Sequence, residues 1–288
     1  MKPYITLLFL SLATLSLSAQ TKRALLIGIG AYPAESGWAT IHGDNDLEIT
    51  SELLQEIGWT KSEIISLRNQ EATKANIIQQ FQQLAQTAEQ GDWVYIHFSG
   101  HGQQMSNWTG DEADGWDEAW IPYDAQKVYA KGKYEGENHL ADDEINGLLS
   151  NIKQQIGASG SLIVVVDACH SGDSSRAEDE DETVMRGVSN KFEIPQQTNA
   201  QSKLMPIDWV VISACKPYMN NYECRIEGQH FGSLSYALYA QRSEISSLSL
   251  SEIQQRTQQL LSSYIPMPQS IMVESPASLS NQRIFKKQ

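Results

Sequence analysis

A cysteine and a histidine, each directly after an apolar run, are the residues of this chain best suited to nucleophilic chemistry. His101 stands in a Ser-Gly-His-Gly loop after the run 92–98, and Cys169 follows the run 161–166. In a parallel sheet both loops would leave the same edge, so the two side chains would meet despite their separation in sequence. A cysteine beside an imidazole ionises readily and forms a nucleophile–base pair. The backbone N–H groups of Gly102 and Cys169 are candidate donors to an oxyanion.

Each residue also has a structural interpretation when it is taken alone. A cysteine after an apolar strand is often a small buried hydrophobe, and a histidine beside glycines often serves the turn. His170, next to Cys169, ranks below His101 as a base because neighbouring residues on a turn point in different directions. A zinc site would need four ligands in closely spaced pairs, and the sequence has no such pairs.

Strands that alternate with helices are predicted to position these residues. Continuous apolar runs predict buried strands, and apolar residues at helical spacing predict helices, with Thr73 as an N-cap. The predicted strands are 23–30, 63–67, 92–98, 161–166 and 209–213, and the predicted helices are 44–57, 73–89, 142–152, 233–241 and 251–262. This alternation indicates an α/β domain whose mostly parallel sheet is covered on both faces.

Composition limits the classes of partner. The chain has 288 residues and a formal net charge of -14, with 41% hydrophobic residues, which is enough for a packed core. An acidic chain lacks the basic face that nucleic-acid binding or docking on anionic lipid requires, so neither partner is expected. Three cysteines are too few for a disulfide scaffold. The spacing of Cys215 and Cys224 leaves open whether these two are bonded.

The N-terminal residues 1–19 have the pattern of a secretory signal peptide. Lys2 precedes an uncharged Leu-rich stretch that ends in Ser18 and Ala19. The run is short for a membrane span, although an uncleaved anchor is the alternative. We therefore expect an exported protein, periplasmic or secreted, that does not contact the membrane after removal of the signal and acts as a monomer.

Several segments resemble the metacaspases, the caspase-like cysteine peptidases. They are RALLIGIGAYP (23–33), GDNDL (43–47), HFSGHGQQ (97–104), DGWDEAWIPYD (114–124) and VVVDACHSG (164–172), with weaker likeness in WVVISAC (209–215) and FGSLSYAL (231–238). The resemblance implies a caspase-like three-layer α/β/α sandwich over 20–288. It would consist of a large-subunit-like part (20–175), an acidic linker loop (176–206) and a small-subunit-like part (207–288).

The resemblance also implies roles for the site residues. His101 would be the general base and Cys169 the nucleophile of an endopeptidase that cuts after Arg or Lys in peptide or protein substrates. The positions that match the acidic specificity pocket are Gly43, Asp46, Ser99 and Asp167. Two carboxylates would bind a guanidinium and reject an acidic side chain. Taken alone, Asp46 is better explained as a carboxylate at a helix N-terminus, and only together with Asp167 is the pocket the preferred interpretation.

Calcium is the one cofactor that the resemblance suggests, although the chemistry itself requires none. The matching acidic positions are Asp117, Asp142 and Asp143, with Asp173 nearby. Carboxylate oxygens are the ligands that Ca²⁺ prefers. The family has an aspartate seven positions after the nucleophile where this chain has Arg176, and solvated surface acids are the alternative.

The long loop 172–206 carries basic residues at which such a peptidase would cut itself. The candidate processing sites are Arg176, Arg186, Lys191 and Lys203, while the acidic run 178–182 is interpreted as a solvating segment. Two other functions stay open: a non-catalytic caspase-like binding or regulatory module, and a clostripain- or gingipain-like peptidase of the same fold.

Overall fold

The computed structural model describes residues 20–107, 115–169, 184–195 and 207–287. The predicted signal peptide, Asp173, Arg176 and Lys203 lie outside the described residues, so the expectations about them stay predictions. None of the helices in the described part of the chain combines the length and the apolar character needed to cross a bilayer.

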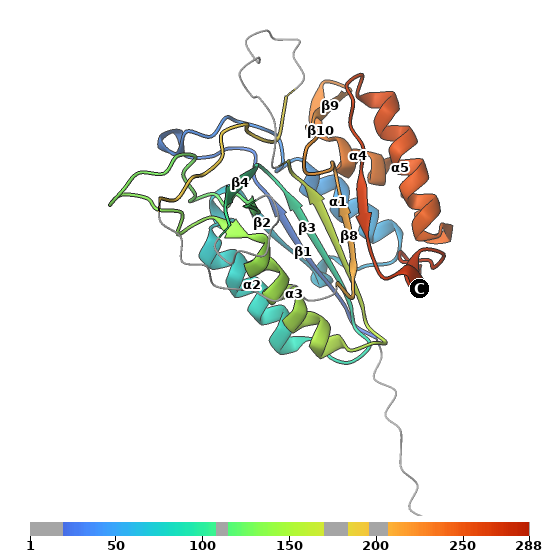
Figure 1. Ribbon diagram of the computed structural model, residues 1–288. Coiled ribbons are helices and arrows are strands. Elements are labelled where there is room, and N and C mark those ends of the chain that lie inside the picture. The colour runs from blue at the N-terminus through green and yellow to red at the C-terminus, as the bar shows by residue number, and fades with distance from the viewer. Residues whose placement is uncertain (1–19, 108–114, 170–183, 196–206, 288) are drawn as a thin grey trace, which may run out of the picture.

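A twisted sheet of six strands forms the middle layer of the described structure (Figure 1). Its order is β11 (Met272–Glu274), β8 (Val210–Ser213), β7 (Ser161–Asp167), β3 (Trp93–Ser99), β1 (Lys22–Gly28) and β2 (Ile64–Arg68). All neighbours pair in parallel except β11, which is antiparallel to β8. The predicted strands are therefore found, and β11 is an additional edge strand.

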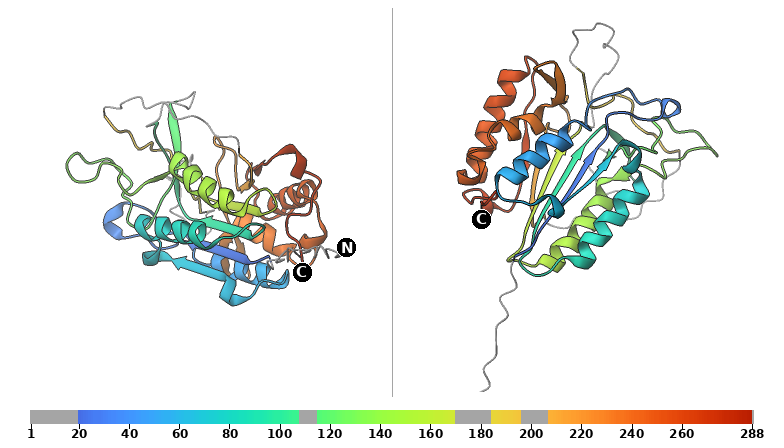
Figure 2. Two further views of the ribbon diagram at one scale, coloured as in Figure 1. Left: turned by 90° about the horizontal axis from the view of Figure 1, so that it is seen from below. Right: turned by 180° about the vertical axis from the view of Figure 1, so that it is seen from behind.

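Helices cover both faces of this sheet, as Figure 2 shows from two sides. One face carries α1 (Asp46–Glu56), α4 (Ser233–Ala240) and α5 (Leu250–Tyr264), and the other carries α2 (Lys74–Thr87) and α3 (Asp142–Ile156). Residues of β7 alternate between the two resulting cores, with Ile163 and Val165 in one and Val164 and Val166 in the other. The predicted α/β/α class is confirmed.

Local signals explain the helices that the sequence predicted. Thr73 caps α2, because its hydroxyl accepts a hydrogen bond from the backbone N–H of Asn76. The stripe Ile77, Phe81 and Leu84 is buried against the sheet. Apolar spacing therefore fixed which face of this helix packs inward.

The sequence did not predict several short polar strands that lie near the carboxyl ends of the central parallel strands. A three-stranded sheet joins β4 (Gly102–Ser106), β5 (Trp116–Trp120) and β6 (Leu140–Ala141), and a hairpin joins β9 (Glu223–Ile226) and β10 (Gln229–Gly232). The sequence of β4, GQQMS, is largely polar and does not alternate, so it carries no periodic strand signal.

Residues 184–195, which were predicted to belong to an acidic linker loop, are packed onto the domain. The backbone N–H of Phe192 donates to the carbonyl of Gln104, and the N–H of Ser106 donates to the carbonyl of Phe192. Val188 and Phe192 are buried in a third apolar cluster with Met105. This segment therefore runs along β4 and reaches the end of the sheet where the candidate site lies.

Candidate active site

The carboxyl ends of β3 and β7 bring the predicted histidine and cysteine loops together. The two strands pair in parallel, with Ser99 opposite Asp167. His101 and Cys169 each follow two residues after this pair, and the N–H of Gly100 donates to the carbonyl of Asp167 across 3.3 Å. The sheet register thus places both loops at one edge, as the sequence predicted.

The ring of His101 is buried and held in one orientation. Its Nε2 lies 2.9 Å from the carbonyl oxygen of Ala39. Because a carbonyl only accepts, Nε2 carries the hydrogen and Nδ1 carries the lone pair. Trp38 stacks on the ring with centroids 4.9 Å apart, and the Tyr32 hydroxyl accepts from the His101 backbone N–H. Burial lowers the pKa of His101 to about 4, so the ring is a neutral base at pH 7.

Cys169 is buried, and its sulfur has two neighbours, the Met219 carbonyl and the Cys215 thiol. Its Sγ donates to the carbonyl of Met219 over 2.8 Å. A hydrogen bond with Cys169, together with burial, raises the pKa of the Cys215 thiol. Cys215 and Cys224, both described, are thiols, so the disulfide left open by the sequence is not formed in this structure.

Arg186 occupies the site with its backbone. Its carbonyl oxygen accepts hydrogen bonds from the N–H of Cys169 at 3.0 Å and from the N–H of Gly102 at 3.4 Å. These are the two N–H groups predicted from the sequence as oxyanion donors. A peptide carbonyl is therefore polarised directly beside the cysteine.

The segment around Arg186 pairs with residues 221–223 in the manner of an added antiparallel strand. The N–H of Arg186 donates to the carbonyl of Asn221 at 3.0 Å, and the N–H of Glu223 donates to the carbonyl of Val184 at 2.8 Å. Met185 and Tyr222 form the bridge between these bonds. Such main-chain pairing is a common way for a protein to hold an extended peptide.

The Arg186 side chain fills the predicted acidic pocket. Its guanidinium is completely buried, with Nη1 2.8 Å from Asp46 Oδ2 and 3.3 Å from the carbonyl of Asp167. Nη1 also donates to the Ser99 hydroxyl at 2.5 Å. Gly43 packs against Ser99. A Cβ added to Gly43 would come within 2.5 Å of the Ser99 carbonyl oxygen.

Glu223 is a pocket residue that was not predicted from the sequence. It lies on β9, and its Oε1 accepts from Arg186 Nε at 3.0 Å. Although burial opposes ionisation, Arg186 and His42 bring the pKa of Glu223 down to about 2. Gly232 on β10 also belongs to the pocket, since an added Cβ there would overlap Asp167 and Arg186. Glu223 stands in no periodic pattern or strand-end motif, whereas Gly232 lies in the segment FGSLSYAL, whose likeness to the metacaspases assigned it no role.

Neutral donors hold the other two carboxylates in place. Asp46 accepts from the Ser99 hydroxyl at 2.6 Å and from the N–H of Gly232 at 2.9 Å. Asp167 accepts from the N–H and hydroxyl of Ser235, both at 2.7 Å, and from Asn221 Nδ2 at 2.8 Å. The pocket thus presents fixed negative charge to one cation, which is the arrangement expected for recognition of a guanidinium.

The other predicted site residues lie elsewhere. Lys191 is exposed with its Nζ 3.9 Å from the Trp116 ring centroid, so it does not occupy the pocket. Asp117 lies on β5, and Asp142 and Asp143 begin α3. Because β5 pairs with β6 at Ala119 and Ala141, the start of α3 lies near Asp117. Among the described residues, the three carboxylates do not form a compact group of metal-ligand atoms. Burial, with the nearby carboxylates, raises the pKa of Asp142 to about 8.

The fold and this geometry define a caspase-like protein with a cysteine–histidine site. The chain belongs to the metacaspase, peptidase C14 domain family, whose model matches residues 22–176, more than half of the chain. It is 31% identical to Metacaspase-1 of Eremothecium gossypii over 52% of this chain and 32% of that protein. It is 24% identical to Metacaspase-1A of Aspergillus terreus over 75% of this chain and 61% of that protein.

A solved structure supports the fold over nearly the whole chain. The crystal structure of protein GSU0716 from Geobacter sulfurreducens superposes with a TM-score of 0.63 and 22% identity, and covers 92% of this chain and 98% of that one. The chain matches only about a third of the length of the Eremothecium relative.

Proposed function

We propose that this protein is a cysteine endopeptidase that hydrolyses peptide bonds after Arg or Lys. The observation that carries the proposal is the position of Arg186. Its guanidinium lies among buried carboxylates while its carbonyl oxygen accepts from the N–H of Cys169. A residue held in this way presents the following peptide bond to the cysteine.

The chemistry follows from these positions. The Cys169 sulfur attacks the carbonyl carbon, its proton passes to His101 Nδ1, and the carbonyl electron pair moves to an oxygen held by the N–H groups of Cys169 and Gly102. The C–N bond then breaks, and His101 returns the proton to the leaving amine. A water molecule, deprotonated by His101, hydrolyses the thioester and restores the thiol.

The pocket contacts support a preference for Arg over Lys. Glu223 contacts Nε, and Asp46 contacts Nη1. A lysine ammonium is a single charged group, and lysine has no donor at the Nε position of arginine, so it would satisfy fewer of these contacts. An acidic side chain would be repelled by the three carboxylates.

The same geometry supports self-processing between Arg186 and Gly187. Of the four basic residues predicted as processing sites, Arg176 and Lys203 lie outside the described residues and Lys191 packs on Trp116. Of the two candidates that the structure describes, Arg186 and Lys191, only Arg186 has its carbonyl oxygen hydrogen-bonded to the proposed oxyanion donors. Cleavage there would leave Arg186 as the new C-terminus in the pocket, and its departure would open the pocket to other substrates.

The test uses short peptides that carry the sequence of residues 184–186. Val-Met-Arg and Val-Met-Lys amides with a fluorogenic leaving group are compared with Val-Met-Gln and Val-Met-Asp. We expect cleavage of the Arg and Lys peptides only, and complete loss in a Cys169→Ala variant. Preference for Asp, or equal activity in the variant, would contradict the proposal. Absence of Cys169 labelling by an Arg-ketone inhibitor in protein that has been cleaved after Arg186, so that the pocket is free, would favour the non-catalytic module instead.

We also propose a calcium site at the meeting of β5 and α3. Asp117 is buried, and Asp142 and Asp143 face the end of its strand across the β5–β6 register. The donor set is all carboxylate oxygen, which fits Ca²⁺. Bound there, Ca²⁺ would neutralise mutual repulsion among these acids. Calcium would affect Cys169 and His101 only indirectly. The path would run from β5 to β4, the strand that pairs with β5 and begins at Gly102.

A further inference from the structure

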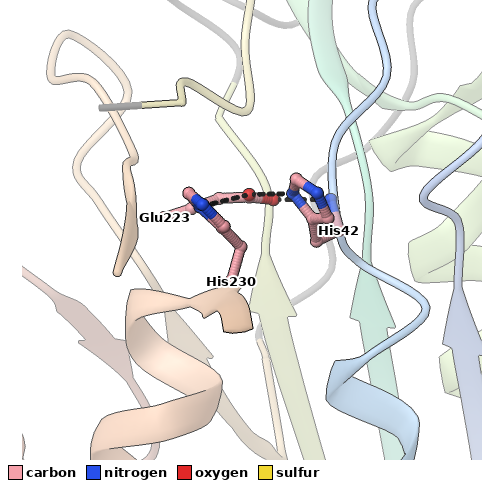
Figure 3. Close-up of side chains that lie close together, drawn as sticks. All are labelled: His42, Glu223 and His230. Carbon is pink, nitrogen blue, oxygen red and sulfur yellow. Dashed lines mark hydrogen bonds and ion pairs between the residues drawn. The ribbon is translucent and has the colours of Figure 1, made fainter. Parts of the chain in front are cut away.

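Two histidines and a glutamate gather beside the acidic pocket, outside the cysteine–histidine pair (Figure 3). His42 lies in the turn before α1, Glu223 lies on β9 and His230 lies on β10. One ligand atom of each residue lies within 4.8 Å of the other two. The cluster joins segments from both halves of the chain, and Glu223 belongs both to this cluster and to the pocket.

The geometry of the cluster leaves one face open to solvent. His42 Nδ1 lies 2.6 Å and His230 Nδ1 lies 3.9 Å from Glu223 Oε2, and the two rings stack with centroids 4.7 Å apart. The Glu223 side chain is fully buried, whereas those of His42 and His230 are 37% and 28% exposed. A solute can therefore reach the two imidazole rings, whereas the buried Glu223 carboxylate is held by hydrogen bonds within the protein.

Glu223 divides its oxygens between two tasks. Oε1 accepts from Arg186 Nε at 3.0 Å and from the His42 backbone N–H at 2.7 Å. Oε2 faces the two imidazoles. The carboxylate is thus oriented by its first oxygen, and its second oxygen is directed at the histidines.

Two imidazoles and one carboxylate are a donor set that zinc commonly takes, with water as the fourth ligand. Metal–ligand distances of about 2.0–2.2 Å in a tetrahedral site place ligand atoms roughly 3.3 Å apart. The observed 2.6 and 3.9 Å lie on either side of this value. All three ligand atoms lie within 4.8 Å of one another, so coordination would require only small shifts of the two partly exposed rings and loss of the proton shared by His42 Nδ1 and Glu223. Calcium, which prefers oxygen ligands, fits this set poorly.

We propose that His42, Glu223 and His230 form a binding site for Zn²⁺ that regulates the specificity pocket. Zinc on Oε2 would draw negative charge from the carboxylate whose other oxygen contacts the substrate guanidinium. Binding of zinc and of an arginine side chain would then oppose each other, and by linkage each would weaken the affinity for the other. This regulatory half rests on the proposed peptidase function, whereas the binding half does not.

The binding half is tested with Zn²⁺ alone. Cys169→Ala protein is titrated by calorimetry, because this change removes a competing thiolate ligand. The matched variant is Cys169→Ala with His230→Phe, which keeps an aromatic ring against His42 and keeps the His230 carbonyl that accepts from Asn45. We expect one bound Zn²⁺ and at least a tenfold loss of affinity in the variant. Equal affinity in the two proteins would overturn the site.

A spectroscopic measurement guards against a variant that misfolds. Co²⁺ added to the Cys169→Ala protein should give visible d–d absorption of a tetrahedral nitrogen–oxygen site, and Zn²⁺ should bleach it. Octahedral Co²⁺ absorption, as in buffer, would contradict the assignment. His230→Gln provides a second variant, whose folding is checked by its melting temperature.

The regulatory half is tested on the Arg peptide. Zinc should raise KM severalfold for the protein with His230 intact and leave the KM of His230→Phe unchanged. A fall in kcat that is equal in both proteins would assign inhibition to Cys169 and overturn this half. Zinc binding without any peptidase activity would show that the proposed function had failed while the metal site stood.

Discussion

The backbone N–H of Cys169 donates a hydrogen bond to the carbonyl oxygen of Arg186 across 3.0 Å. The residue that carries the thiol therefore also holds the carbonyl of the peptide bond that we expect to be cut. Since the Arg186 side chain is completely buried in the acidic pocket, another arginine cannot enter while this segment is in place. The intact chain is thus expected to be blocked by its own segment 184–187.

Removal of Arg186 should abolish self-processing at this bond. We expect Arg186→Gln to stay intact, Arg186→Lys to cleave more slowly than the native chain, and Lys191→Gln, a matched change in the same segment, to cleave normally. Intact mass spectrometry and N-terminal sequencing of the fragment should place its start at Gly187. Cleavage of Arg186→Gln at an unchanged rate and position would contradict the assignment.

The same substitution should cost stability, because it leaves buried carboxylates without their cation. Removal of one partner of a buried ion pair costs about 3–5 kcal/mol. Denaturant unfolding should therefore show Arg186→Gln to be less stable than Lys191→Gln in the Cys169→Ala background, in which all chains stay intact. If Arg186→Gln and Lys191→Gln unfold with equal denaturant midpoints and equal slopes, the pocket tolerates an uncompensated charge and the prediction is wrong.

Glu223 should set the preference for Arg over Lys. Its Oε1 contacts both Nε, which has no counterpart in lysine, and Nη2, each at 3.0 Å, whereas Asp46 contacts Nη1. A hydrogen bond to a charged group contributes about 1.5–3 kcal/mol. Glu223→Gln should therefore lower kcat/KM for the Arg peptide by about ten- to a hundredfold and for the Lys peptide much less.

The control for this prediction is Glu48→Gln, on the same helix as Asp46, because the Glu48 side chain is 77% exposed. Its kinetics should match those of the native protein. A uniform loss for both peptides in Glu223→Gln would indicate that Glu223 supports the fold of the pocket and does not discriminate between the two side chains.

The sequence predicted the fold and the centre of the site because both depend on local patterns. Apolar runs identified β3 and β7, and their ends carry His101 and Cys169. Glu223 was missed because it lies on a short polar hairpin strand, and its role arises only when β9 reaches Arg186. Ala39 was missed for a different reason: it contributes a backbone carbonyl, which every residue possesses.

Tyr32 is expected to position His101 without touching substrate. Its hydroxyl accepts from the His101 N–H and donates to the carbonyl of Ile121, each at 3.1 Å. Tyr32→Phe removes both bonds and keeps the ring, so we expect kcat to fall about tenfold, equivalent to roughly 1.4 kcal/mol, with KM unchanged. Parallel changes in kcat and KM would instead indicate a general disturbance of the pocket.

Calcium should stabilise the protein through the acids at the start of α3. At a hundredfold excess over Kd, a single site adds about 2.7 kcal/mol to the free energy of unfolding. Ca²⁺ should raise the melting temperature of the native chain but not that of Asp142→Asn. Asp208→Asn, whose side chain is 69% exposed in the native protein, is the control. An equal rise in all three proteins would place calcium elsewhere.

Self-processing should slow as the pH falls through about 6. Burial raises the pKa of Asp46 to about 6 even though Arg186 opposes this shift, and burial lowers the pKa of His101 to about 4. A carboxyl with a raised pKa takes up its proton first on acidification, so the pocket loses one negative charge while His101 is still a neutral base. The rate of fragment formation, measured from pH 8 to pH 4, should therefore decline near pH 6.

Asp46→Asn separates the two titrations. Its amide does not ionise, so processing should be slower at neutral pH but nearly constant until His101 is protonated near pH 4. Circular dichroism at each pH shows whether the chain is still folded. If the processing rate of Asp46→Asn still declines near pH 6, another group causes that decline and the Asp46 carboxylate does not control the rate.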